Sequence, residues 1–285
     1  MQLGQFRLSV LSDGEFRLDG GAMFGVIPKV MWSPVKWCDE RNRIRMATNC
    51  LLVEAGSDLV LVDTGKGDKQ DAKFEELYGY QPGPSLPDAI RAAGFELGDL
   101  THVVLTHLHF DHCGWNTTRT AAGSFVPTFP RARYWLNRGE VEHARQPNER
   151  DRASYLPYNW EPLFAAGVVE LFDDRTAIVA GVEAVKAPGH NADMCVVTID
   201  GGGGAKAVFW ADLVPHATHV PYPWIMSYDL YPVTTLESKR AWIPRAAEER
   251  WLCVFEHDAD QPLGRIVEEK PGRFRAIAVD PTAAG

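Results

Sequence analysis

Four side chains that can bind a metal ion lie within six residues of the chain: His107, His109, Asp111 and His112. They follow residues 101–106, an apolar run that predicts a buried strand. Side chains two positions apart in an extended chain point the same way, so His107 and His109 can bind one cation together. Asp111 continues this alternation and His112 points to the other side, which lets one loop serve two adjacent cations. The alternative, a solvated polar loop, seldom concentrates three histidines and an aspartate. Imidazole and carboxylate ligands suit Zn²⁺ and neighbouring first-row metals.

Three further ligand-type residues stand where an apolar, strand-like run stops. His190 follows the run 178–187, Asp212 follows 207–210, and His257 follows 251–255. Strand ends are where α/β folds place their functional sites. Each residue alone is equally well explained by packing or by a polar loop. Taken together with the cluster at 107–112, they indicate the rest of one metal shell.

Composition narrows the class of protein. The 285 residues carry 29 Lys plus Arg against 38 Asp plus Glu, a formal net charge of −9, which argues against nucleic acid or an anionic membrane as a partner. No run approaches the roughly 18 apolar residues of a membrane span, and no secretory signal is visible, so we expect a cytoplasmic protein. Five cysteines without a Cys-x-x-Cys pair favour neither a disulfide framework nor a zinc ribbon. Four of them are expected in the core, and Cys113 is expected to be a bystander beside the cluster.

Elements that could position these residues follow from periodicity and turn signals. Strands are expected at 49–54 and 59–62 (a hairpin), 101–106, 133–136, 168–172, 178–187, 194–199, 207–210 and 251–255, with a final hairpin over 265–278. Helices are expected at 69–78, at 85–93 behind a Ser85 cap, at 139–145, and from a Thr234 cap to about residue 250 with a kink at Pro244. Residues near 137–167 are expected to form an irregular or helical insertion. Strands mixed with helices in both halves predict an α/β fold of sheets with helices outside.

These pieces resemble the metallo-β-lactamase superfamily. The resemblance rests on five matches: His-Leu-His-Phe-Asp-His at 107–112, Asp63-Thr64-Gly65, Gly189-His190, Ala211-Asp212, and His257 after a strand. It implies an α/β (α+β, four-layer) αββα sandwich, formed by residues 1–285 as a single domain, with a binuclear metal site at one edge.

The resemblance also implies a role for each residue. His107, His109 and His190 would bind the first metal, while Asp111, His112 and His257 would bind the second. Asp212 would bridge both, and Asp63 would orient a ligand from behind, although a turn-forming role before Gly65 explains Asp63 as well. The expected cofactors are two divalent ions, Zn²⁺ first, with Fe, Mn or Co as alternatives.

Two dications about 3.5–4 Å apart lower the pKa of a bridging water toward neutrality, and the resulting hydroxide can attack a carbonyl or phosphoryl centre. Asp111 is the carboxylate best placed to move a proton there. The expected activity is therefore hydrolysis. A non-catalytic metal-bearing binding module is the alternative from another class.

Two branches of the superfamily match best. The motif resembles N-acyl homoserine lactonases, which are known for a tyrosine three residues after the bridging aspartate. Pro215 stands there instead, with His216 next as a candidate catalytic donor or as a packing residue. Residues 212–214 also resemble organophosphate-hydrolysing relatives. Both branches imply small neutral or hydrophobic ester or lactone substrates. Apolar segments at 23–28, 31–32 and 222–226, with Tyr228 and Tyr231, are expected to line the substrate pocket, to pack in the core or to form a homodimer contact.

Overall fold

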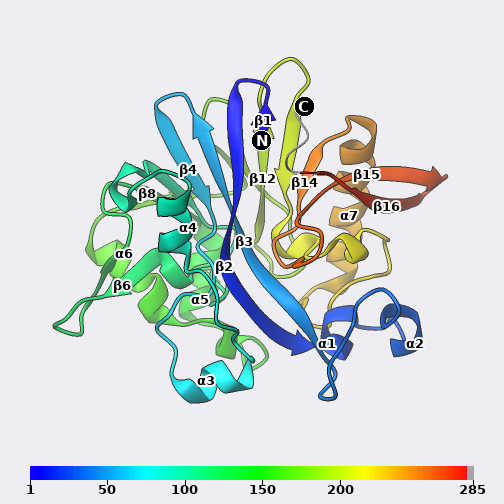
Figure 1. The fold of residues 1–285 in the computed structure, drawn as a ribbon, viewed down its shortest axis with the longest axis horizontal. Helices are drawn as coiled ribbons and strands as arrows, with labels where there is room; N and C mark the ends of the chain where they lie inside the picture. The colour runs from blue at the N-terminus through cyan, green and yellow to red at the C-terminus, as the bar shows by residue number, and fades with distance from the viewer. Residues whose placement is uncertain (281–285) are drawn as a thin grey trace.

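The computed structural model describes residues 1–280, so the last five residues of the expected domain lie outside the described residues. Two large sheets form its centre (Figure 1). The first contains, in spatial order, β1 (Gln2–Leu3), β2 (Phe6–Asp19), β3 (Arg43–Ala55), β4 (Asp58–Val62), β5 (His102–Val104), β8 (Arg133–Asn137) and β9 (Val169–Phe172). The second contains β10 (Arg175–Val179), β11 (Val182–Lys186), β12 (Cys195–Asp200), β13 (Lys206–Phe209), β14 (Leu252–Val254), β15 (Leu263–Lys270) and β16 (Arg273–Ala278). A small hairpin joins β6 (Thr117–Arg119) to β7 (Phe125–Pro127).

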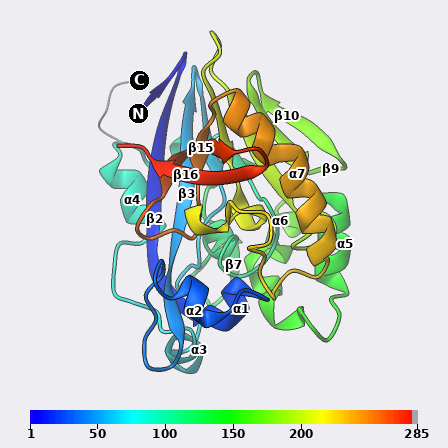
Figure 2. The same ribbon diagram turned by 90° about the vertical axis from the view of Figure 1, so that its right-hand side faces the viewer.

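The helices are α1 (Gly20–Phe24), α2 (Lys29–Trp32), α3 (Ala72–Leu77), α4 (Leu86–Ala92), α5 (Arg138–Arg145), α6 (Glu161–Ala165) and α7 (Pro232–Glu248). Helices α4 to α7 cover the outer faces of the sheets, whereas α1, α2 and α3 lie at their lower end in Figure 1. In Figure 1, α4, α5 and α6 lie on the side of the first sheet and α7 lies on the side of the second, and Figure 2 shows α7 along the outer flank. The arrangement confirms the expected four-layer α/β sandwich.

Strand β3 shows why the layers form. Its residues alternate between two cores: Leu51 and Val53 belong to the cluster that includes Val196 of the second sheet, whereas Cys50 and Leu52 belong to the cluster that includes helix α4. A strand buried on both faces needs apolar residues at every position, and the run from Cys50 to Val53 supplies them.

Strand direction brings the ligand-type residues to one edge. β4, β5 and β8 are mutually parallel in the first sheet, and β13 is parallel to β14 in the second. The carboxyl ends of β4 and β5 therefore present Asp63 and the 107–112 loop, while those of β13 and β14 present Asp212 and His257. His190 follows β11, where Gly189 adopts a φ of 148° and a Cβ would lie 2.3 Å from Thr235 Oγ1, so glycine is required before this histidine.

Two of the sequence expectations were wrong in detail. The run 178–187 is not one strand, because Gly181, with a φ of 84°, turns the chain between β10 and β11. Helix α7 begins at Pro232, and its N-cap Tyr231 lies three residues before the expected Thr234 cap, because proline is well suited to the first turn. The long strand β2 and helices α1 and α2 were not predicted. The other expected strands, the hairpins and the Ser85 cap are confirmed.

The insertion and the apolar segments can now be placed. Residues 138–165 contain α5, two short 3₁₀ turns (Arg152–Ser154 and Pro157–Asn159) and α6, as expected of an irregular or helical insertion. Phe24 and Trp32 pack in a core cluster, so part of segment 23–32 is core. Val26 is exposed, as are Val30 and Met31 on α2, so the homodimer contact stays a prediction.

Four cysteines are buried, whereas Cys38 is only partly so. No helix within residues 1–280 is both long and apolar enough to span a membrane.

Lys239 of α7 is a buried cation that organises the segment leading into the site. Its Nζ donates to the backbone carbonyls of His219, Pro221, Tyr222 and Trp224 at 2.5–3.4 Å, and the side chain has no exposed surface. Burial lowers the pKa of Lys239 to about 7, while the surrounding carbonyl oxygens favour the charged ammonium; their hydrogen bonds to Nζ gather residues 219–224 against α7.

We predict that Lys239→Met destabilises the protein by about 3 kcal/mol, because several buried carbonyls lose their donor. Urea unfolding followed by fluorescence measures the free energy of unfolding. Arg240→Met, at the exposed neighbouring position, is the matched control and should change it by less than about 0.5 kcal/mol. Equal effects of the two variants on the free energy of unfolding would contradict the stabilising role of the Lys239 hydrogen bonds.

Candidate metal centre

Seven ligand-type side chains converge at the shared edge of the two sheets. His107, His109, His190 and Asp212 form one group and Asp111, His112 and His257 form a second, and within each group the ligand atoms lie within 4.8 Å of one another. All seven are the residues singled out in the sequence. The first group draws on both sheets, since the histidine loop follows β5 and Asp212 follows β13.

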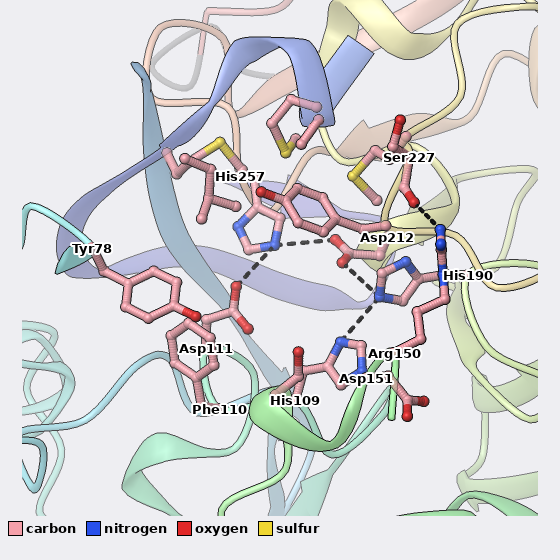
Figure 3. Close-up of a pocket in the computed structure, with 17 residues that line it drawn as sticks. Tyr78, His109, Phe110, Asp111, Arg150, Asp151, His190, Asp212, Ser227 and His257 are labelled. Carbon is pink, nitrogen blue, oxygen red and sulfur yellow. Dashed lines mark hydrogen bonds and ion pairs between the residues drawn. The ribbon is translucent and has the colours of Figure 1, made fainter. Parts of the chain in front are cut away.

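Asp212 lies between the two groups (Figure 3). Its Oδ2 is 3.1 Å from His190 Nε2 in the first group, and its Oδ1 is 3.0 Å from His257 Nε2 in the second. Asp111 approaches the second group, with Oδ2 3.8 Å from His257 Nε2. The carboxylate of Asp212 thus contacts both sets, each through a different oxygen, as a bridging ligand requires.

The outer nitrogen of most of these rings is held by an oxygen. His257 Nδ1 donates to the Ala47 carbonyl at 2.8 Å, His190 Nδ1 lies 3.0 Å from Asp229 Oδ1, and His107 Nδ1 lies 3.1 Å from Thr106 Oγ1. A neutral imidazole has one donor and one acceptor nitrogen, so an oxygen acceptor on Nδ1 leaves a lone pair on Nε2. These lone pairs face the centre.

His112 has two carboxylates behind it. Asp63 Oδ2 and Glu256 Oε2 lie 3.0 and 2.9 Å from its Nδ1, and Asp63 also accepts from the amide and hydroxyl of Thr106. Burial raises the pKa of Glu256 well above its usual value, against the opposing effect of the His112 ring. Asp63, His112 and Glu256 themselves form a third group of ligand atoms, but its carboxylates approach Nδ1, whereas Nε2 of His112 faces the second group.

These donors fit divalent cations. Nε2 of His112 and Nε2 of His257 lie 3.2 Å apart, and His109 Nδ1 lies 3.0 Å from His190 Nε2, so ring nitrogens converge in pairs on the centre. His107 Nε2 is buried and has no hydrogen-bond partner among the described residues. A cation between deprotonated ring nitrogens satisfies all of them, whereas a hydrogen bond between two of them requires one ring to keep its proton.

The pKa shifts of His107, His109 and Asp212 favour the protonation states that bind metal. Burial lowers the pKa of His107 and of His109 well below the usual histidine value, and neighbouring histidines lower both further. Burial alone would raise the pKa of Asp212, but the His190 and His257 rings outweigh it and hold that pKa well below its usual value. His107, His109 and the ionised Asp212 carboxylate are thus held in the forms that bind metal, whereas, against the opposing effect of burial, Asp212 raises the pKa of His190 and of His257, so those two rings must release a proton when a cation binds.

A cavity of about 320 Å³ opens onto the two groups. His109, Asp111, His190, Asp212 and His257 line it, as Figure 3 shows. Its apolar wall comes from segments far apart in the sequence: Leu18, Met23, Met46, Phe110 and Met226. Arg150 of the insertion also lines it and donates through Nη2 to the Ser227 carbonyl, which joins the insertion to residues 226–228 across the cavity rim.

One sequence expectation, the role of His216 as a catalytic donor, is not supported by this geometry. His216 is fully buried and is absent from the described residues that line the cavity; its ring packs edge-on against His219 at 5.4 Å. Tyr228 lines the cavity instead and remains 39% exposed. Cys113 is buried with its thiol directed to the Leu108 carbonyl, so it is a bystander. Glu256 and Asp229 were not predicted as partners of the histidines.

One relative of known sequence matches most of this chain, and another matches half of it. A probable metallo-hydrolase of Mycobacterium bovis is 31% identical over 277 residues, which cover 84% of this chain and 85% of that protein. An N-acyl homoserine lactonase of a Bacillus species is 29% identical over 152 residues, which cover 50% of this chain and 53% of the relative.

Solved structures extend the likeness to the whole fold. A probable metal-dependent hydrolase from Staphylococcus aureus superposes with a TM-score of 0.90 at 26% identity and covers all of both chains. A dizinc quorum-quenching lactonase, solved with a product bound, superposes with a TM-score of 0.80 at 22% identity over 99% of this chain and 97% of that one, and supports the fold alone. Residues 43–257 match the description of the Metallo-beta-lactamase superfamily, and this match together with the fold means that the chain belongs to that superfamily of metal-dependent hydrolases.

Proposed function

We propose that this chain is a binuclear metallo-hydrolase that opens lactones or cleaves related esters. The observation that carries the proposal is the position of Asp212, which contacts both groups of buried ligand atoms at the floor of a cavity. In a structural zinc site, four protein ligands fill every coordination position and leave none open for a substrate. Seven ligand-type residues beside a cavity instead favour two ions that keep open positions.

Each residue then has a role. His107, His109 and His190 would hold the first ion, Asp111, His112 and His257 would hold the second, and Asp212 would bridge them. Two bound divalent ions, with Zn²⁺ the first candidate, would supply Lewis acidity and a water of lowered pKa. Asp111 Oδ2 borders the cavity and would accept a proton there and return it to the leaving oxygen.

In this proposal Tyr228, and not His216, is the hydrogen-bond donor to the substrate. The Tyr228 phenol lines the cavity and can donate to the substrate's carbonyl oxygen, whereas His216 has no exposed surface. The apolar wall formed by Leu18, Met23 and Met226 suits an acyl chain. N-acyl homoserine lactonases among the relatives support a lactone or ester over a phosphotriester. We further propose a cytoplasmic location, in keeping with five free cysteines.

Metal removal is the first test. We expect about two Zn²⁺ per chain by elemental analysis after reconstitution, and a loss of turnover together with a fall in Tm after chelation, because buried ligands lose the ions that neutralise them. Turnover is measured on a panel of substrates that contains lactones, aryl esters and a phosphotriester. Two ions with no turnover on the panel would favour a binding module, turnover of the phosphotriester alone would move the protein to that branch, and fewer than one ion per chain would overturn the proposal.

The role of Asp111 can be tested separately. We expect Asp111→Asn to lower kcat by roughly 10²–10³-fold and to weaken the second ion, since the amide cannot accept the proton and is a poorer ligand. Asp68→Asn, at an exposed position outside the cavity, serves as the control with an unchanged rate. Full activity in Asp111→Asn with both ions bound would exclude the assigned role.

Tyr228 and His216 can be distinguished by two variants. Loss of the phenol in Tyr228→Phe should lower kcat by about 10²-fold without lowering Tm, because a single donor to the developing oxyanion is removed. His216→Ala should lower Tm, because it creates a cavity in the core, and should leave kcat within a few-fold. The reverse pattern would return the donor role to His216.

A further inference from the structure

His109 differs from the other four histidines of the centre. It presents Nδ1, not Nε2, to its neighbour His190, at 3.0 Å. Its outer nitrogen, Nε2, is buried and has no hydrogen-bond partner among the described residues. No oxygen therefore fixes the rotation of this ring from behind, so some other contact must hold it.

The insertion supplies that contact. The Tyr155 ring packs edge-on against the His109 ring, with centroids 4.8 Å apart and an interplanar angle of 68°. The two residues are also paired through their backbones, and the amide of Phe110 donates to the Ser154 carbonyl at 2.9 Å. The chain around Tyr155 thus lies alongside the chain around His109.

Tyr155 is itself fixed by a buried carboxyl group. Its hydroxyl donates to Glu140 Oε1 at 3.2 Å, and the same oxygen accepts the Leu108 amide at 2.9 Å. Glu140 lies on α5 and is 1% exposed, and Tyr155 is 4% exposed. One oxygen of Glu140 therefore ties together helix α5, the loop between His107 and His109, and the ring that packs on His109.

We infer that Tyr155 and Glu140 are positioning residues for His109, and that the insertion at 138–165 thereby sets the affinity of the first metal site selectively. This inference rests on the proposed function, because it assumes that His109 binds an ion. The second group is positioned by other residues, since His112 and His257 are held by Asp63, Glu256 and the Ala47 carbonyl.

The test measures metal affinity instead of turnover. Co²⁺ serves as the probe, with absorption spectra and competition against a chelator reporting each binding step on the full chain. His109→Ala identifies the step that belongs to the first group. We expect Tyr155→Leu to weaken that step by about 10–100-fold, the usual effect of losing a partner that orients a ligand, and to change the other step by less than about threefold.

Two more variants keep the result interpretable. Tyr158→Leu removes another aromatic ring from the same insertion, one that stacks on Phe125, and should leave both steps unchanged. Tyr155→Phe keeps the ring and loses only the hydroxyl contact with Glu140, so it should fold normally and weaken the first step less than Tyr155→Leu does. Both steps weakened equally by Tyr155→Leu, or neither weakened, would overturn the inference. A wild-type chain that binds no Co²⁺ would instead contradict the proposed function.

Discussion

The structure depends on bringing seven metal-competent side chains out of water to one point without leaving them unsatisfied. Asp212 is central to this constraint, because its two oxygens lie 3.0 and 3.1 Å from histidines of different groups. It follows β13 of the second sheet, whereas the 107–112 loop follows β5 of the first. The two sheets must therefore end at the same edge. The apolar core between them, with Leu51 and Val53 on one side and Val196 on the other, fixes that alignment.

Fixing the site also costs conformational energy. Asp63 and Ala211, which precede parts of the centre at the ends of β4 and β13, adopt positive φ angles of 55° and 47°. Such conformations cost of order 1–3 kcal/mol in a residue with a side chain and persist only where the surroundings impose them. For Asp63 the surroundings are visible: its carboxylate accepts the Thr106 amide at 2.8 Å and the Thr106 hydroxyl at 2.6 Å and lies against His112. Hydrogen bonds that orient a metal-competent ring thus also hold the strained turn.

The sequence could predict the centre because its residues sit in a dense motif and at the ends of apolar strands. It could not predict the residues behind the rings, since Asp229 is 39 positions from His190 and Glu256 is an ordinary polar residue at a strand end. His216 was expected in the site because it lies close to Asp212 in sequence, but the 3₁₀ turn at Ala217–His219 begins there and its ring packs inward. Strand β2 was missed because its alternation is irregular, with the pairing register to β3 shifting between Ser12 and Glu15. Local pattern thus located the ligand-type residues, whereas long-range packing placed most of the groups that orient them, with Thr106 beside His107 as the local exception.

The two parts of the site differ in how they are built. The ligand atoms come from strand ends that the sandwich holds rigidly, whereas the cavity wall comes from connecting segments: Met23 from α1, Arg150 from the insertion and Met226 from the segment before α7. Connections of this kind vary more easily than the sheets they join. The likeness to the Staphylococcus aureus structure, with a TM-score of 0.90 at 26% identity, is therefore stronger evidence for a shared fold and metal chemistry than for a shared substrate. The insertion belongs to both parts, since Arg150 lines the cavity while Tyr155 packs on His109. If the proposed function holds, changes in that segment would alter substrate fit and ligand geometry together, because one segment contributes both to the cavity wall and to the packing on His109.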